Sequence, residues 1–168
     1  MLFIYNDFAG THTTVLAAAY HLQKLDPTRE PTREEILACH NFNKLAFSDR
    51  GKLYFHGIDE DGNKVYTMGR GISTILVPGI YNLIDMLIEE KAINEKIILS
   101  DTSPTVPFRM RCGGLLSLWM KIDVLGVPLL VAGARQAYQV IAQLVRHTKN
   151  TANTTTSQLV MLENKQFK

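Results

Sequence analysis

The chain has 168 residues, of which 46% are hydrophobic and 20% are charged, and its formal net charge at pH 7 is +2. This size fits one domain with a tail, and the composition is that of an ordinary folded domain. So small a net charge does not support nucleic-acid binding, and no apolar run reaches the roughly 18 residues that span a bilayer. The first residues also lack the basic leader of a signal peptide.

The two cysteines, Cys39 and Cys112, lie far apart in the sequence and form no CxxC pattern. Neither a disulfide framework nor a zinc site is therefore expected, and the pattern is typical of a protein in the reducing cytoplasm. We interpret both cysteines as small buried hydrophobes rather than as catalytic thiols.

The chain begins with a predicted strand, followed by two predicted helices. The apolar run at 2–5 is typical of a strand covered on both faces, and residues 14–25 have the pattern of a helix. Thr32 and Glu35 have capping-box spacing, which predicts a short helix that ends near Cys39.

A β-hairpin is predicted in the middle of the chain. Residues 52–58 and 64–68 read as strands on either side of the turn dipeptide Asp61-Gly62. A mostly helical stretch follows and ends near Ala92.

The second half alternates between predicted strands and helices. Strands are expected at 96–100 and 127–132, and helices at 105–121 and 136–147. Residues 149–168 are rich in Thr, Asn and Gln and read as a polar, weakly ordered tail.

Strands that alternate with helices favour a parallel sheet with helices on both faces. We therefore predict a three-layer α/β sandwich of Rossmann-like type with a mostly parallel sheet. The β-hairpin is either an insertion into this sheet or its antiparallel edge. Residues 1–148 would form the single α/β domain, with 149–168 as its tail.

Three of the predicted strands end in polar or glycine-bearing turns, at 6–14, 101–103 and 133–135. Ligands of open parallel sheets bind outside the carboxyl ends of the strands, so these turns are expected to meet at one edge. This convergence is the main functional indication in the sequence.

The first turn, Asp7-Phe8-Ala9-Gly10-Thr11-His12-Thr13-Thr14, joins a strand to a helix. Gly10 would allow a sharp turn and the close approach of a ligand, while the free amides of a helix N-terminus attract phosphate. Threonine hydroxyls add donors, and His12 would serve as acid, base or phosphoryl acceptor, with Asp7 orienting it or binding a metal. The candidate ligand-binding residues of this turn are Gly10, Thr11, Thr13 and Thr14.

The same turn is also consistent with a plain helix cap. It is not a Walker A loop, because no Gly-Lys-Ser/Thr is present. In this alternative, Thr11 or Thr13 is the N-cap residue and His12 is merely exposed.

Asp101 follows an apolar strand, as the metal-coordinating aspartate does in many nucleotide hydrolases. It is a candidate to bind a divalent ion such as Mg²⁺ or to orient a water, and the alternative is a turn-capping residue. Thr102 and Ser103 would line the same site. Arg135, expected just after a strand, would bind an anion through its guanidinium group.

His56, near the end of the first hairpin strand, is a further candidate to reach over the site. The alternative is a half-buried sheet histidine. We expect the remaining histidines, which are His21, His40 and His147, to be surface groups.

Residues 4–15, with the alanines that follow, Phe55-His56-Gly57 and Asp101-Thr102, together resemble a known family. This is a domain-of-unknown-function family of small uncharacterised proteins, found mainly in spore-forming Gram-positive bacteria. The resemblance covers roughly the first 145 residues, and its most distinctive part is the Gly-Thr-His-Ser/Thr segment at Gly10. It implies a cytoplasmic bacterial protein and points to the same histidines, but it carries no known activity.

We predict a phosphate- or nucleotide-binding protein that transfers a phosphoryl group or hydrolyses a phosphate ester of a small molecule. Its catalytic groups would be His12, Asp7 and Asp101. The alternative is a non-catalytic regulatory or protein-interaction module. A hydrolase with Ser103 or Thr13 as nucleophile is a third possibility, although no G-x-S-x-G elbow is present.

Overall fold

The computed structural model describes residues 1–168 as one five-stranded sheet with five α-helices. The strands are β1 (Leu2–Asp7), β2 (Leu53–Ile58), β3 (Lys64–Gly69), β4 (Ile97–Asp101) and β5 (Leu159–Leu162). The helices are α1 (Thr13–His21), α2 (Arg33–Ala38), α3 (Leu76–Glu89), α4 (Phe108–Gly114) and α5 (Asp123–Thr154). A π-helical segment, Leu115–Trp119, follows α4 directly.

The strands lie in the order β2-β3-β1-β4-β5. Neighbouring strands are parallel except for β2, which runs antiparallel to β3. The predicted α/β class with a mostly parallel sheet is thus confirmed. The hairpin also forms, but β3 pairs with β1 over six residues, so the hairpin is part of the sheet and β2 is its antiparallel edge.

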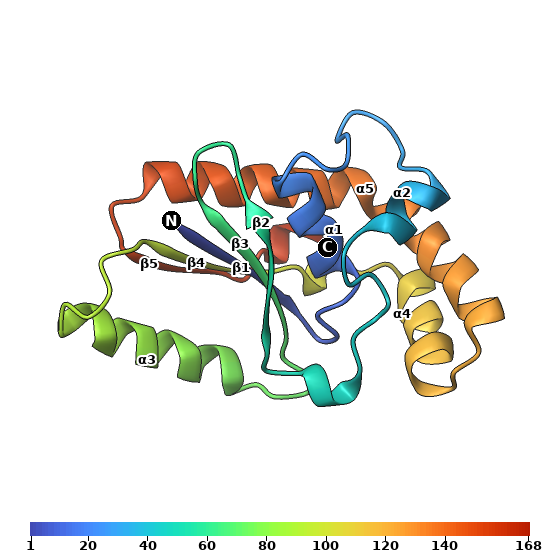
Figure 1. The fold of residues 1–168 in the computed structure, drawn as a ribbon, viewed down its shortest axis with the longest axis horizontal. Coiled ribbons are helices and arrows are strands. Elements are labelled where there is room, and N and C mark those ends of the chain that lie inside the picture. Colours follow the sequence, from blue (N-terminus) through green and yellow to red (C-terminus); the bar gives the residue numbers. More distant parts are fainter.

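The core lies on both faces of the sheet because side chains of a strand alternate between the faces. Tyr5 of β1 belongs to a buried cluster formed largely with α1 and α5. Its neighbour Ile4 belongs to a second cluster, in which Val77 and partly buried residues of α3 pack on the sheet. Figure 1 accordingly shows α3 along one side of the sheet and α5 along the other.

The predicted strand at 127–132 is wrong, because these residues lie inside the 32-residue helix α5. A short apolar run has no periodicity that separates a buried strand from a buried helix. The run is apolar here because α5 packs closely on α4 and its π-helical extension. A Cβ at Gly126 would lie 2.8 Å from the Ser117 amide nitrogen, and one at Gly133 would lie 2.9 Å from that of Met110.

Residues 149–168 also differ from the expected weakly ordered tail. The helix α5 continues to Thr154, and β5 pairs in parallel with β4. Lys96 holds the connection by donating hydrogen bonds to the carbonyls of Ala152 and Thr155. These residues therefore complete the sheet.

Helix α5 is also long and apolar enough to cross a membrane when only length and composition are considered. Core helices of folded domains pass the same test, and 39% of its most apolar window is buried inside the structure.

Candidate functional site

The sheet order reverses between β1 and β4. From β1 the chain continues into the hairpin on one side, and from β3 it crosses through α3 to β4 on the other side. In open α/β sheets such a reversal leaves a crevice at the carboxyl ends of the strands, where ligands bind. Here that edge carries Asp7 of β1 and Asp101 of β4, with Arg70 directly after β3.

The turns after β1 and β4 meet at this edge. The buried Asp7 carboxylate accepts hydrogen bonds from the Gly10 amide and, at 2.7 Å, from the Thr13 hydroxyl. The Thr13 hydroxyl in turn lies 3.0 Å from the Thr102 hydroxyl. The structure therefore brings together the predicted site residues Asp7 and Thr13 of the first turn and Thr102, which lies 89 residues after Thr13.

Gly10 and Thr11 have structural tasks in this turn. Gly10 has a φ of +73°, and a Cβ there would lie 2.4 Å from the amide nitrogen of Gly69, so the close approach is to the end of β3. The Thr11 hydroxyl donates to the Asn41 carbonyl and accepts from the Lys44 amide, which fixes the loop before β2.

The tip of α1 keeps unsatisfied donors. The backbone amides of Thr13 and Thr14 donate no hydrogen bond within the chain, and His12 gives the helix no side-chain cap. The Thr14 hydroxyl is buried and also has no partner. An anion at this tip would nevertheless face the carboxylate of Asp7, which already accepts the hydrogen bond of the Thr13 side chain.

His12 is buried, with 5% of its surface exposed, so it is not the exposed cap of the alternative interpretation. Its Nε2 lies 3.2 Å from Oδ1 of Asn43, and its ring packs edge-on against Phe42. Burial lowers the pKa of His12 below its ordinary value, although the hydrogen bond to Asn43 and the charge of Asp7 act in the opposite direction. Burial therefore favours the neutral form of this imidazole.

His12 and Asp7 line a cavity of about 400 Å³ whose other walls are mostly apolar. The apolar side chains come mainly from α4 and its π-helical extension. Besides Asp7 and His12, the polar side chains that line the cavity are those of Ser103 and Arg111. The full lining is Asp7, Phe8, Ala9, His12, Ser103, Val106, Met110, Arg111, Gly114, Leu115, Leu118 and Trp119. A largely apolar cavity with a few converging polar groups is typical of small-molecule sites. We call it the histidine cavity.

A second hollow of about 660 Å³ lies beside the first along the same edge, and we call it the basic hollow. It is lined by four basic side chains and two acidic ones, which are Arg70, Arg111, Lys165, Lys168, Asp101 and Glu163. The two spaces share Ser103, Val106 and Arg111. They therefore adjoin each other along this edge.

Asp101 is held by polar contacts inside the basic hollow. Its Oδ2 accepts a hydrogen bond of 2.9 Å from Arg70 Nη2, and its Oδ1 accepts one of 2.8 Å from the Ser103 amide. Arg70 also donates to the Ser103 hydroxyl at 3.0 Å. No group of three or more His, Cys, Asp or Glu side chains comes together as a metal site, and the expected Mg²⁺ on Asp101 would have to share that carboxylate with Arg70.

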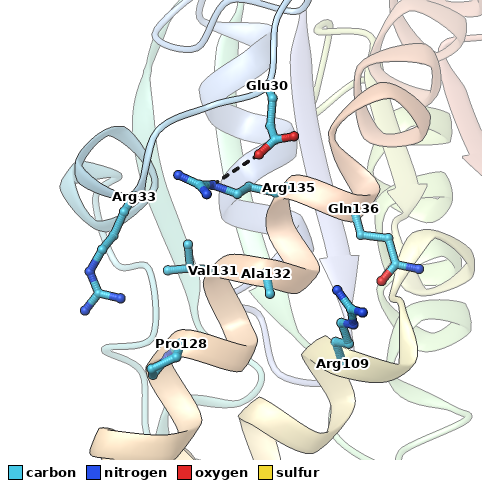
Figure 2. A pocket seen from close by; sticks show the side chains of 8 residues that line it. All are labelled: Glu30, Arg33, Arg109, Pro128, Val131, Ala132, Arg135 and Gln136. Atoms are coloured by element: carbon cyan, nitrogen blue, oxygen red, sulfur yellow. Dashed lines mark ion pairs between the residues drawn. The ribbon is translucent and has the colours of Figure 1, made fainter.

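His56 and Arg135 lie outside both spaces. The His56 ring is hydrogen-bonded to Thr67 at 2.9 Å, and burial is the main cause that lowers its pKa to about 4. Arg135 follows no strand, because it belongs to α5. It contacts Glu30 at 3.3 Å beside a different hollow, where Arg33 and Arg109 also lie (Figure 2).

Sequence reasoning found Arg70 only in part and missed other residues at the edge. Arg70 was considered as a companion of His56 that reaches over the site from the returning hairpin strand, whereas it directly follows β3 at the same edge as Asp101. Arg111, Lys165 and Asn43 left no comparable signal, because helix α4, a late segment and a long loop bring them to the site.

His21 was expected at the surface, and this is wrong, since only 1% of its surface is exposed. Its Nδ1 lies 2.8 Å from the Tyr5 hydroxyl and its Nε2 lies 2.9 Å from Asp59 Oδ2. The partners are 16 and 38 residues away, so no local pattern could have revealed them.

The chain itself matches a known family. Residues 2–150 match the DUF3189 family, which is described as "Protein of unknown function", and the chain is therefore a member of this family. No curated protein and no solved structure matches the chain.

Proposed function

We propose that this protein binds a phosphorylated small molecule or nucleotide at the carboxyl edge of a Rossmann-like three-layer scaffold. It transfers the phosphoryl group or hydrolyses the phosphate ester, with His12 as the general base. The observation that carries the proposal is the contact between the basic hollow and the histidine cavity, which share Ser103 and Arg111.

The basic hollow suits the phosphate. Its four basic side chains outnumber its two carboxylates, and guanidinium groups match phosphate oxygens with paired hydrogen bonds. Arg111 lines both spaces and has no ion-pair partner in the chain, so it is the first candidate to bind phosphate at their junction. The phosphate is assigned to this hollow rather than to the turn at Gly10, because Asp7 brings a negative charge to that turn.

The histidine cavity suits the remainder of the ligand. Its volume of about 400 Å³ and its apolar walls fit a nucleobase or a small organic group. Burial favours the neutral form of His12, which a general base needs before it acts, and the nearby charge of Asp7 stabilises the imidazolium ion that forms when His12 takes up a proton.

Ligand-induced stabilisation tests the binding. The temperature of half-unfolding is measured with inorganic phosphate, ribonucleotides and sugar phosphates, with magnesium present. A ligand at about 100 times its Kd stabilises the folded state by about 2.7 kcal/mol, which raises the midpoint by roughly 5–10 °C. The shift is expected to be lost in Arg111→Gln and kept in Arg146→Gln, because Arg146 lies on α5 outside both spaces. No shift with any phosphorylated compound contradicts the proposal.

Turnover tests the catalysis. Release of inorganic phosphate from the compounds that bind is expected to fall about 10²–10⁴-fold in His12→Ala, the range that general base catalysis supplies. Transfer to an acceptor instead of water appears as consumption of the ligand without free phosphate.

A specific surface favours the alternative, a non-catalytic interaction module. Phe108, Trp119 and Val124 are 78%, 58% and 85% exposed around the start of α4 and α5. If compounds bind without being consumed, and Phe108→Ser with Val124→Ser abolishes capture of a partner while His12→Ala does not, the module is favoured.

Both cysteines are free thiols, in keeping with the cytoplasmic location that we propose.

A further inference from the structure

A chain of hydrogen bonds leads from His12 to the start of α5. We infer that Asp123 fixes the tautomer of His12 through Ser117 and Asn43, so that Nδ1 is the ring nitrogen that acts in the histidine cavity. Asn43, Ser117 and Asp123 are positioning residues in this scheme. Its catalytic meaning rests on the proposed function, whereas the tautomer itself can be measured without any ligand.

The direction of the chain is set at Asp123. An ionised carboxylate only accepts hydrogen bonds, so the buried Ser117 hydroxyl donates its proton to Asp123 Oδ1. A hydroxyl has one proton, and Ser117 Oγ must therefore accept in its other contact. That contact is with Asn43, whose Nδ2 lies 2.7 Å away and donates.

This assignment orients the Asn43 amide. With its NH₂ group directed at Ser117, its oxygen faces His12, where Oδ1 lies 3.2 Å from Nε2. An amide oxygen has no proton, so Nε2 of His12 carries the hydrogen. A neutral imidazole has only one N–H, and Nδ1 therefore keeps a free lone pair. Tautomers and amide orientations are ordinarily ambiguous, but here a carboxylate three hydrogen bonds away decides both.

The Nδ1 edge of the ring has space beside it. No group in the chain is hydrogen-bonded to Nδ1. A Cβ at position 114 would lie 3.3 Å from His12 Cε1 and 3.7 Å from Nδ1, and Gly114 lines the same cavity as His12. The missing side chain of Gly114 thus leaves this edge of the ring open. Gly114 directly precedes the π-helical segment, a type of distortion that is frequent at functional sites.

These contacts define the proton transfer. Nδ1 takes a proton from a water or from an acceptor hydroxyl, whose O–H bond breaks as the N–H bond forms and whose oxygen bonds to phosphorus. The P–O bond to the leaving oxygen breaks, and the ring returns its proton to that oxygen or to solvent. The positive ring keeps its Nε2–H bond to Asn43, and Asp7 supplies the nearby negative charge. In this scheme Nε2 has a purely orienting role.

The tautomer is measured on ¹⁵N-labelled whole protein by long-range ¹H–¹⁵N correlation of the imidazole rings near pH 7.5, with His12→Ala used for assignment. The expected result is a protonated Nε2 and an unprotonated Nδ1 for His12. In Ser117→Ala the Asn43 amide is free to turn, so averaged shifts from both tautomers are expected. In the double variant Ser117→Ala with Asn43→Asp, either carboxylate oxygen is an acceptor for Nε2, so the single tautomer is expected to return. A merely structural role for Asn43 does not predict this recovery. A protonated Nδ1 in the wild-type protein, or an unchanged spectrum in Ser117→Ala, overturns the inference.

Gly114→Ala tests the catalytic meaning. The backbone at Gly114 is helical, with φ −64° and ψ −39°, so the alanine backbone is unstrained there, and the His12 ring has to move only a few tenths of an ångström to admit the Cβ, so the variant is expected to fold. We expect at least a tenfold loss in kcat, since the new methyl group crowds the Nδ1 edge. If this variant keeps the wild-type kcat, Nδ1 does not take part in the reaction. Absence of phosphate-ligand binding would instead contradict the proposed function and leave the tautomer result standing.

Discussion

Helix α1 has a buried histidine at each end, and the two differ in how many ring nitrogens have partners. His21, the last residue of the helix, has Tyr5 on Nδ1 and Asp59 on Nε2. His12, just before the helix, has Asn43 on Nε2 and no partner on Nδ1. Burial alone therefore does not distinguish the two histidines, whereas the number of ring nitrogens with a partner separates His21 from His12, for which we propose a catalytic role.

The environment of His21 explains its structural role. Asp59 also accepts hydrogen bonds from the Asn63 amide and side chain, so it joins the hairpin turn to the end of α1. Burial raises the pKa of Asp59, but the hydrogen bonds from Asn63 and His21 outweigh it and hold the pKa at about 2. Tyr5, His21, Asp59 and Asn63 therefore form one hydrogen-bonded network in which both ring nitrogens of His21 have a partner.

The largest expected effect separates the two histidines by stability. His21→Ala removes a buried ring and leaves Asp59 without its histidine partner, which typically costs about 3–5 kcal/mol. His12→Ala removes a ring that already borders the histidine cavity, and we expect the free energy of unfolding to fall by roughly 1–2 kcal/mol. Urea unfolding of the two variants measures both values. Equal losses would remove the distinction between the two sites.

A smaller effect is expected when His21 is made to resemble His12. Tyr5→Phe takes away the hydroxyl from Nδ1 of His21 and keeps the ring that fills the core. The unmade hydrogen bond costs about 1–2 kcal/mol, measured as a shift of the urea midpoint. Binding of phosphorylated ligands should be unchanged, because Tyr5 does not line either space at the edge. A loss of binding in this variant would mean that the two ends of α1 are coupled.

Stability is expected to fall in mild acid. Burial lowers the pKa of His12, His21 and His56 in the folded state, that of His56 to about 4. The unfolded chain therefore binds more protons below pH 6.5, so the stability present above pH 6.5 is lost as the pH falls toward the folded pKa values. Each histidine contributes up to about 1.4 kcal/mol per pH unit in this window. Urea midpoints from pH 7.5 to 4.5 measure the slope. The slope should be smaller in His21→Gln. A wild-type stability that increases as the pH falls contradicts the lowered histidine pKa values.

The smallest effect concerns Thr14, which the sequence suggested as a ligand residue. Its hydroxyl is buried without a partner, so Thr14→Val removes an unsatisfied group at nearly constant volume. We expect a change between zero and about 1 kcal/mol in favour of the folded state, seen as an equal or higher melting temperature. Weaker phosphate-ligand binding in this variant would return Thr14 to the site.

The sequence predicted the first strand, the hairpin and the strand before Asp101 well, because each has a clear apolar run with turn residues at its ends. The capping box at Thr32 also forms, with both of its hydrogen bonds present. Local chemistry determines these features, so local patterns suffice to find them. The failure at 127–132 arose because close packing of α5 on α4 produces the same apolar run as a buried strand.

The candidate site was predictable only in part. Asp7, His12 and Thr102 follow from the rule that strand ends gather at one edge. Arg135 was misplaced together with its false strand, and His56 was assigned to the edge although it lies in the middle of β2. The partners of His12 come from a loop, a π-helical turn and the start of α5, and only the packing of distant segments brings them together.

The late position of β5 has a consequence for synthesis. Strand β4 has hydrophobic residues and, until residues 159–162 leave the ribosome, an unpaired edge of amide and carbonyl groups. Such an edge readily recruits strands of other chains. The nascent chain thus keeps an aggregation-prone strand edge throughout the translation of the 32-residue helix α5.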